Sequence, residues 1–66
     1  MTRFGIPDMT CQGCIDSITR AVRTVDPAAR VTADLGHHSV EIDSAATAGA
    51  LEAAITEAGF TVQPAA

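Results

Sequence analysis

The chain has 66 residues, a formal net charge of −4 at pH 7 and a hydrophobic fraction of 47%. This length predicts one domain over residues 1–66. Eight carboxylates against four arginines argue against nucleic acid, whose phosphates would be repelled, and two phenylalanines give no platform for base stacking. The sequence has neither a membrane-length apolar run nor a signal-peptide pattern, so we expect a cytoplasmic protein without membrane insertion.

Hydrophobic periodicity predicts that the first two elements flank a loop with both cysteines. Phe4 and Ile6 fall on one face of a strand over residues 3–6, which ends at the following proline. Apolar residues then recur at helical spacing from 12 to 25, which predicts an amphipathic helix. Pro27 ends this helix because a proline disfavours the helical backbone in the residue before it.

The second half of the chain begins with a predicted hairpin. Alternation over residues 31–35 and 40–43 predicts two strands, joined by a turn of glycine and polar residues. A second helix is expected over residues 46–58, with Ser44 or Thr47 as its N-cap and the following glycine as its stop.

A closing strand over residues 60–63 completes the order βαββαβ. This order predicts an α+β, ferredoxin-like sandwich, with two helices on one face of a four-stranded antiparallel sheet. In that arrangement the first loop, the hairpin turn and the junction after the second helix share one end of the molecule. The residues expected at this end are Cys11, Cys14, His37, His38 and Phe60.

Cys11 and Cys14 stand at the predicted start of the first helix, where free backbone N–H groups and the helix dipole favour thiolates. Thiolates bind soft ions such as Cu(I) and Zn(II), but a structural zinc site needs four protein ligands. Two thiolates suffice for a two-coordinate Cu(I) that stays open to attack by another thiolate. The sequence therefore predicts a carrier that holds one Cu(I) and releases it to a partner's cysteine.

The segment Met-Thr-Cys-Gln-Gly-Cys at residues 9–14 and the segment Leu-x-x-Ala-Ile-x-x-Ala-Gly-Phe at residues 51–60 carry a resemblance to a known family. Over essentially its whole length, the chain resembles the heavy-metal-associated domain family. Its length is similar to that of the small bacterial copper chaperones, which hand Cu(I) to the N-terminal metal-binding domain of a P-type copper-transporting ATPase. The resemblance implies this fold, this metal, this kind of partner and no enzymatic activity.

The resemblance also implies roles for single residues. Cys11 and Cys14 match the metal ligands of the family, and Met9 matches a buried methionine that anchors the loop. Phe60 stands where many bacterial members carry a tyrosine beside the metal, whereas Asp8 replaces a common glycine. Four residues are thus expected to support the metal loop: Met9, Thr10, Gly13 and Phe60.

Two other functions fit the same cysteines. A Cys-x-x-Cys pair also serves in dithiol/disulfide redox proteins, although no tryptophan precedes the first cysteine here. The pair could equally carry another soft ion, such as Hg(II) or Zn(II). Thr10 resembles copper-type members of the family, whereas zinc-exporting relatives often have an aspartate at that position.

The remaining candidates have simpler interpretations. His37 and His38 are interpreted as solvated turn residues, and the alternative is that one supplies a third ligand in a metal-bridged homodimer. Arg20 and Arg23 lie on the polar side of the first helix, where they form a solvated face or contribute to docking on an acidic partner.

Overall fold

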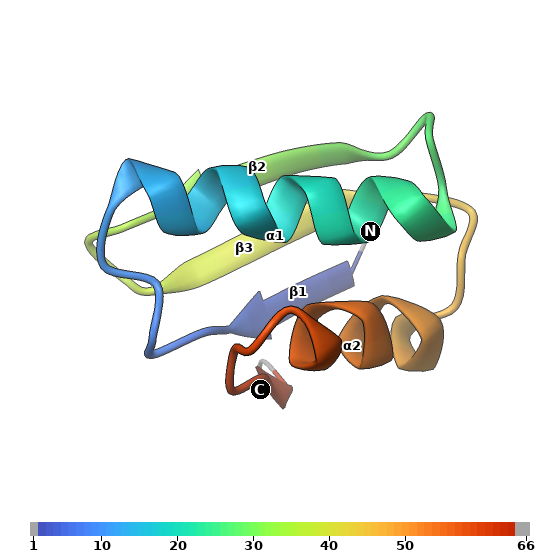
Figure 1. Ribbon diagram of the computed structural model, residues 1–66. Helices are drawn as coiled ribbons and strands as arrows, with labels where there is room; N and C mark the ends of the chain where they lie inside the picture. Colours follow the sequence, from blue (N-terminus) through green and yellow to red (C-terminus); the bar gives the residue numbers. More distant parts are fainter. Residues whose placement is uncertain (1, 65–66) are drawn as a thin grey trace.

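The computed structural model describes residues 2–64, which form six elements in the order βαββαβ. The strands are β1 (Thr2–Gly5), β2 (Arg30–Asp34), β3 (Ser39–Asp43) and β4 (Gln63–Pro64), and the helices are α1 (Gln12–Val25) and α2 (Ala48–Glu57). Figure 1 shows the two helices side by side over one face of the sheet. The expected α+β architecture of two helices on an antiparallel sheet is confirmed.

The sheet has the order β2-β3-β1-β4, and every neighbouring pair is antiparallel. Phe4 lies opposite Val40, which in turn lies opposite Ala33. These side chains share one face because residues directly opposite each other in a ladder point to the same side. Neither helix within residues 2–64 has the length and apolar character needed to cross a membrane.

The core lies between this face of the sheet and the two helices. The helices contribute apolar residues at a spacing of four, Ile18 and Val22 from α1 and Leu51 and Ile55 from α2. Among the described residues, the buried apolar side chains are Phe4, Ile6, Met9, Ile18, Val22, Ala29, Val40, Ile42, Leu51 and Ile55. Two of them, Ile6 and Met9, belong to the connection between β1 and α1, so the core reaches under this loop.

Backbone conformation sets the ends of α1, whereas a side chain caps the start of α2. The bounds of α1 match the prediction, and its C-cap Asp26 has the extended backbone expected before a proline. The helix α2 starts two residues later than predicted, because the Thr47 side chain accepts a hydrogen bond from the Ala50 N–H at 3.3 Å. Gly59 follows α2 with a φ of 101°, a conformation in which glycine avoids the strain of a side chain.

The predicted closing strand over residues 60–63 begins too early, because β4 pairs with β1 only from Gln63 onward. The Phe60 N–H donates to a carbonyl in the last turn of α2 at 3.4 Å. The Thr61 N–H donates to a carboxylate oxygen of Asp8 at 2.9 Å. The N–H groups of Phe60 and Thr61 therefore already have partners outside the sheet, and β4 contains only two residues.

The strands β1 and β2 each begin and end one residue earlier than predicted, and β3 begins one residue earlier. The strand β2 ends at Asp34, so Leu35 lies in the turn, where it is 38% exposed. Val25, expected on the buried face of the first helix, is 40% exposed because it lies at the helix end, beyond the core.

Candidate metal centre

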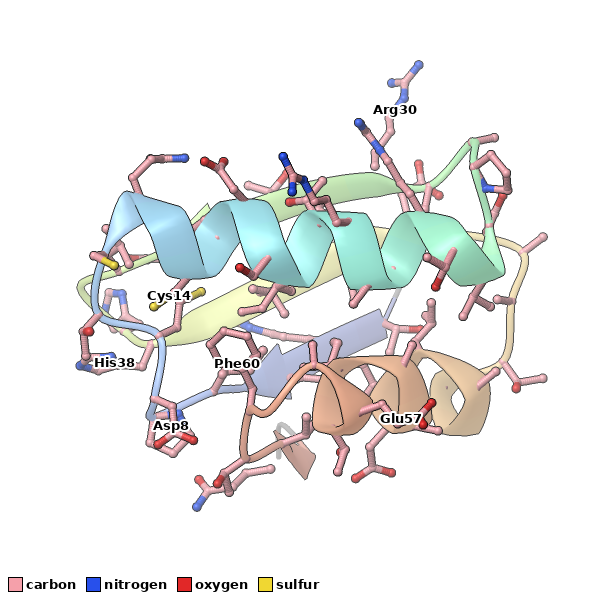
Figure 2. The ribbon with its side chains drawn as sticks, in the orientation of Figure 1. Asp8, Cys14, Arg30, His38, Glu57 and Phe60 are labelled. Carbon is pink, nitrogen blue, oxygen red and sulfur yellow. The ribbon has the colours of Figure 1, made fainter. Side chains whose placement is uncertain are left out.

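Three connections that are distant in the sequence meet at one end of the molecule, as the predicted topology requires. Figure 2 shows Asp8, Cys14, His38 and Phe60 at this end. Two hydrogen bonds join these connections. One links Met9 in the first loop to His38 in the hairpin turn, and the other links Asp8 in the first loop to Thr61 after α2. The loop with the cysteines is thus positioned by two other segments of the chain.

Cys11 and Cys14 lie at the start of α1. Cys11 is the N-cap, with an extended backbone, and its carbonyl oxygen accepts the N–H groups of Cys14 and Ile15 at 3.1 and 3.3 Å. The Sγ atoms of Cys11 and Cys14 are 3.4 Å apart, longer than a disulfide bond of about 2 Å, so both cysteines are free. One ion about 2.3 Å from each sulfur can bridge sulfurs up to about 4.6 Å apart.

The two thiols differ in their surroundings. Cys11 is exposed, whereas Cys14 is half-buried and its Sγ lies 3.8 Å from the carbonyl oxygen of Asp8. A hydrogen bond from the Thr10 backbone, and next the Cys11 thiol, lower the pKa of the Cys14 thiol, against a smaller opposing effect of burial. The surroundings of Cys14 therefore favour its thiolate form relative to a free cysteine.

Met9 and Phe60 pack against the core near the cysteines. Met9 is fully buried, and its N–H donates to the carbonyl of Ile6 at 3.0 Å, which closes a turn before the cysteines. Phe60 is half-buried and contacts the edge of the core. The thioether of Met9 is thus part of the core, while the thiol of Cys11 is exposed.

Thr10 and Gly13 are both exposed parts of the cysteine segment. A Cβ atom at Gly13 would lie 3.8 Å from the Cys11 Sγ, which is an ordinary contact. Steric room therefore does not explain the glycine in this structure.

Both histidines are exposed residues of the hairpin turn, as predicted, but each also makes a contact. His38 Nδ1 lies 2.9 Å from the carbonyl oxygen of Met9, so this exposed ring also contacts the cysteine loop, a contact that the sequence did not predict. His37 is exposed, and its Nδ1 lies 2.7 Å from a carboxylate oxygen of Asp34, which lowers the pKa of Asp34. The predicted position of the turn already placed both histidines at this end, but local sequence does not specify the contact with Met9.

Asp8 has a contact that the sequence does not predict, because its carboxylate bonds to Thr61. The only signal was its departure from the glycine that the family commonly has before the methionine. Within residues 2–64, no group of three or more His, Cys, Asp or Glu side chains is arranged to hold a metal ion. Within one chain, then, His38 does not complete a three-ligand group with the cysteines.

The family model described as the heavy-metal-associated domain matches residues 3–61, nearly the whole chain. The chain belongs to the heavy-metal-associated domain family. This confirms the resemblance seen in the two sequence segments around the cysteines and Phe60.

Two curated relatives of this heavy-metal-associated domain have copper-related names. This chain is 35% identical over 57 residues to the COP-associated protein of Helicobacter felis, and the match covers 83% of this chain and 86% of that protein. It is 36% identical over 64 residues to the copper-transporting ATPase 1 of Rhizobium meliloti, covering 94% of this chain. The domain spans only 8% of the length of that ATPase.

Solved structures of similar length share the fold. The copper chaperone Atx1 from Synechocystis PCC6803, in a Cu2 form, superposes with a TM-score of 0.91 at 33% identity, covering 96% of this chain and all of that one. A gold-binding protein superposes with a TM-score of 0.92 at 31% identity, covering 98% of this chain and all of that one.

Proposed function

We propose that this heavy-metal-associated domain is a copper chaperone that binds one Cu(I) between the thiolates of Cys11 and Cys14. The observation that carries the proposal is the pair of free sulfurs 3.4 Å apart at the exposed start of α1. A site with two soft ligands suits Cu(I) and leaves the ion open to a further thiolate. A closed zinc site would need four protein ligands.

Release would proceed by exchange of sulfur ligands. A thiolate of the partner adds to Cu(I) to give a three-coordinate intermediate, after which the bonds to the two cysteines of this chain break in turn. The ion keeps its oxidation state throughout, and the thiols left behind regain protons from water. The domain therefore transfers a cargo and makes no bond in an organic substrate.

We propose the N-terminal metal-binding domain of a P-type copper-transporting ATPase as the acceptor, in the cytoplasm, where thiols stay reduced. Two similarities support this choice. The chain is 36% identical to part of a copper-transporting ATPase, and 33% identical to a copper chaperone over 96% of its length. A second copy of the chain offers the same thiolates, so a copper-bridged homodimer is the competing acceptor.

The first experiment is an anaerobic titration with Cu(I) in the presence of a competing chromophoric ligand. We expect one Cu(I) per chain for the wild type and loss of binding in Cys11→Ser and Cys14→Ser. Gln12→Ala is the matched control, because Gln12 lies between the cysteines and bonds only to Asp16 among the described side chains. Copper binding by Cys11→Ser with wild-type stoichiometry and affinity would refute the proposal.

A second experiment separates the acceptors. The Cu(I)-loaded chain is mixed with a soluble ATPase metal-binding domain, and the copper in each protein is measured after separation. Transfer to that domain is expected, and light scattering of the loaded chain alone should give a monomer. A loaded dimer that retains its copper in the presence of the domain would argue for the copper-bridged homodimer.

The two competing functions have their own readouts. The short distance between the sulfurs and the lowered pKa of Cys14 also suit a dithiol redox protein, which would reduce insulin disulfides with turnover. The similarity to a gold-binding protein makes other soft ions direct competitors. Displacement of bound Cu(I) by Hg(II) or Zn(II) at equal concentration would favour a carrier for those ions.

A further inference from the structure

We propose that Asp8 and His38 hold the segment that precedes Cys11 in its metal-ready conformation before any metal arrives. The His38 side chain bonds to the backbone of Met9, and the Asp8 side chain bonds to the backbone of Thr61. We call these two bonds the loop clamp. The clamp deepens the proposed copper function, but its test uses the metal-free protein, so the two can fail separately.

The first bond of the loop clamp comes from the hairpin turn between β2 and β3. The Nδ1 of His38 lies 2.9 Å from the carbonyl oxygen of Met9, and because a carbonyl only accepts, Nδ1 is the donor. The carbonyl oxygen of His38 also accepts the Ile6 N–H at 2.6 Å. His38 thus contacts the segment at two points, three residues apart.

The backbone of His38 explains how one residue reaches both points. Its φ is 50°, in the left-handed region that glycine adopts freely and that asparagine, aspartate and histidine adopt more often than other residues. This conformation allows the side chain and the carbonyl of one turn residue to contact the same neighbouring segment. An asparagine could adopt the same backbone and offer an N–H donor, which gives a conservative variant for the test.

The second bond of the loop clamp joins Asp8 to the segment after α2. A carboxylate oxygen of Asp8 accepts the Thr61 N–H at 2.9 Å, across 53 positions of the chain. Thr61 follows Phe60, which packs against the core, so Asp8 is bonded to a segment that is itself anchored. The carbonyl of Asp8 lies 3.8 Å from the Cys14 Sγ, so the same residue also contacts the second cysteine.

Together the two bonds fix adjacent residues, Asp8 and Met9, immediately before Thr10 and Cys11. Fixing this segment limits the positions that the Cys11 thiol can take relative to Cys14, which is held by α1. The entropy lost in ordering the loop is then lost during folding and not during metal binding. We therefore infer that Asp8 and His38 are positioning residues and not ligands.

Amide hydrogen exchange of the metal-free protein, followed by NMR, tests the loop clamp at each bond. His38→Gly removes the ring without straining the left-handed backbone, and with it the hydrogen bond to the Met9 carbonyl. The Met9 N–H, which donates to the Ile6 carbonyl in the same turn, reports the loosened segment. It should exchange up to about fivefold faster, the ratio for a lost hydrogen bond of ~1 kcal/mol. Asp8→Ala should accelerate exchange at Thr61 by a similar factor. The amide of Val22 in α1 is the control for global stability, and the loop amides should accelerate more than Val22 does.

Rescue variants separate the hydrogen bonds from a general loss of packing. His38→Asn keeps a donor and the left-handed conformation, and Asp8→Asn keeps an acceptor oxygen, so each should return exchange to near the wild-type rate. Loop amides that exchange at the wild-type rate in His38→Gly and Asp8→Ala would overturn the proposal. So would failure of both asparagine variants to restore protection.

Copper transfer gives the functional readout. Because a less ordered loop holds the ion less well, we expect His38→Gly to release Cu(I) to a competing ligand faster than His38→Asn does. Equal release rates for these two variants would contradict a positioning role. A chain with the expected exchange pattern that binds no Cu(I) would refute the copper function and leave the loop clamp intact.

Discussion

Cys11 and Cys14 occupy different positions relative to α1 and therefore differ in chemistry. Cys11 precedes the helix and is exposed, whereas Cys14 lies in the first turn and is half-buried. The Thr10 backbone, followed by the Cys11 thiol, stabilises the charged form of Cys14. The pair thus combines an accessible sulfur with one whose pKa is lowered, which suits exchange of a soft ion between proteins.

The lowered pKa of Cys14 gives a prediction for the Cys11→Ser variant. Its one thiol should ionise at a lower pH in the folded than in the unfolded chain, because the main cause, the Thr10 backbone contact, is retained. The ultraviolet absorbance of the thiolate against pH measures both midpoints, with guanidinium providing the unfolded control. Equal midpoints would show that the loop does not stabilise the thiolate.

Asp26 connects two elements, because it ends α1 and contacts the connection between β3 and α2. Its carboxylate accepts the Ser44 hydroxyl at 2.6 Å and the N–H groups of Ala28 and Ala45 at 3.0 and 3.3 Å. Ser44, followed by the Ala28 N–H, lowers the pKa of Asp26. This cluster joins the end of α1 to the connection between β3 and α2, at the end opposite the cysteines, as the order of the elements requires.

The pH dependence of stability tests the Asp26 cluster. Because the folded pKa is lowered, the carboxylate stabilises the fold above the unfolded pKa of about 3.9, and this stabilisation disappears as the pH falls through the folded pKa. The melting temperature of the wild type should therefore be higher than that of Asp26→Asn at pH 7, and this difference should vanish in strong acid. Thermal unfolding by circular dichroism at both pH values measures it.

Glu57→Gln is the control for the Asp26 cluster. Glu57 is exposed at the C-terminal end of α2, where the helix dipole disfavours a negative charge, so this variant should lose no stability at pH 7. Equal melting temperatures of Asp26→Asn and wild type at pH 7 would contradict the assigned role of Asp26.

At the scale of the whole molecule, one thin core supports the metal loop. The molecule measures 26 × 25 × 18 Å, which leaves room for one layer of side chains between the helices and the sheet. Ile6 and Met9 extend this layer beneath the loop, so the stability of the core and the position of the cysteines depend on each other.

The matched leucines Leu51 and Leu35 test this view of the core. Leu51 is fully buried, so Leu51→Ala should cost about 2–5 kcal/mol, a large part of the ~3–10 kcal/mol expected for a chain of this length. Leu35 is 38% exposed in the turn, and Leu35→Ala should cost less than ~1 kcal/mol. Urea unfolding measures both values, and similar costs would contradict the assigned core.

The sequence by itself determined the order of elements, the bounds of α1, the fold class and the family, because periodicity, capping residues and the cysteine motif are local patterns. Tertiary structure decided the start of β4 and the partners of His38 and Asp8. Those features depend on hydrogen bonds between residues 29 and 53 positions apart, Met9 with His38 and Asp8 with Thr61. A local pattern cannot specify such pairs, because which backbone group remains free to bond is settled only when the sheet and both helices have packed.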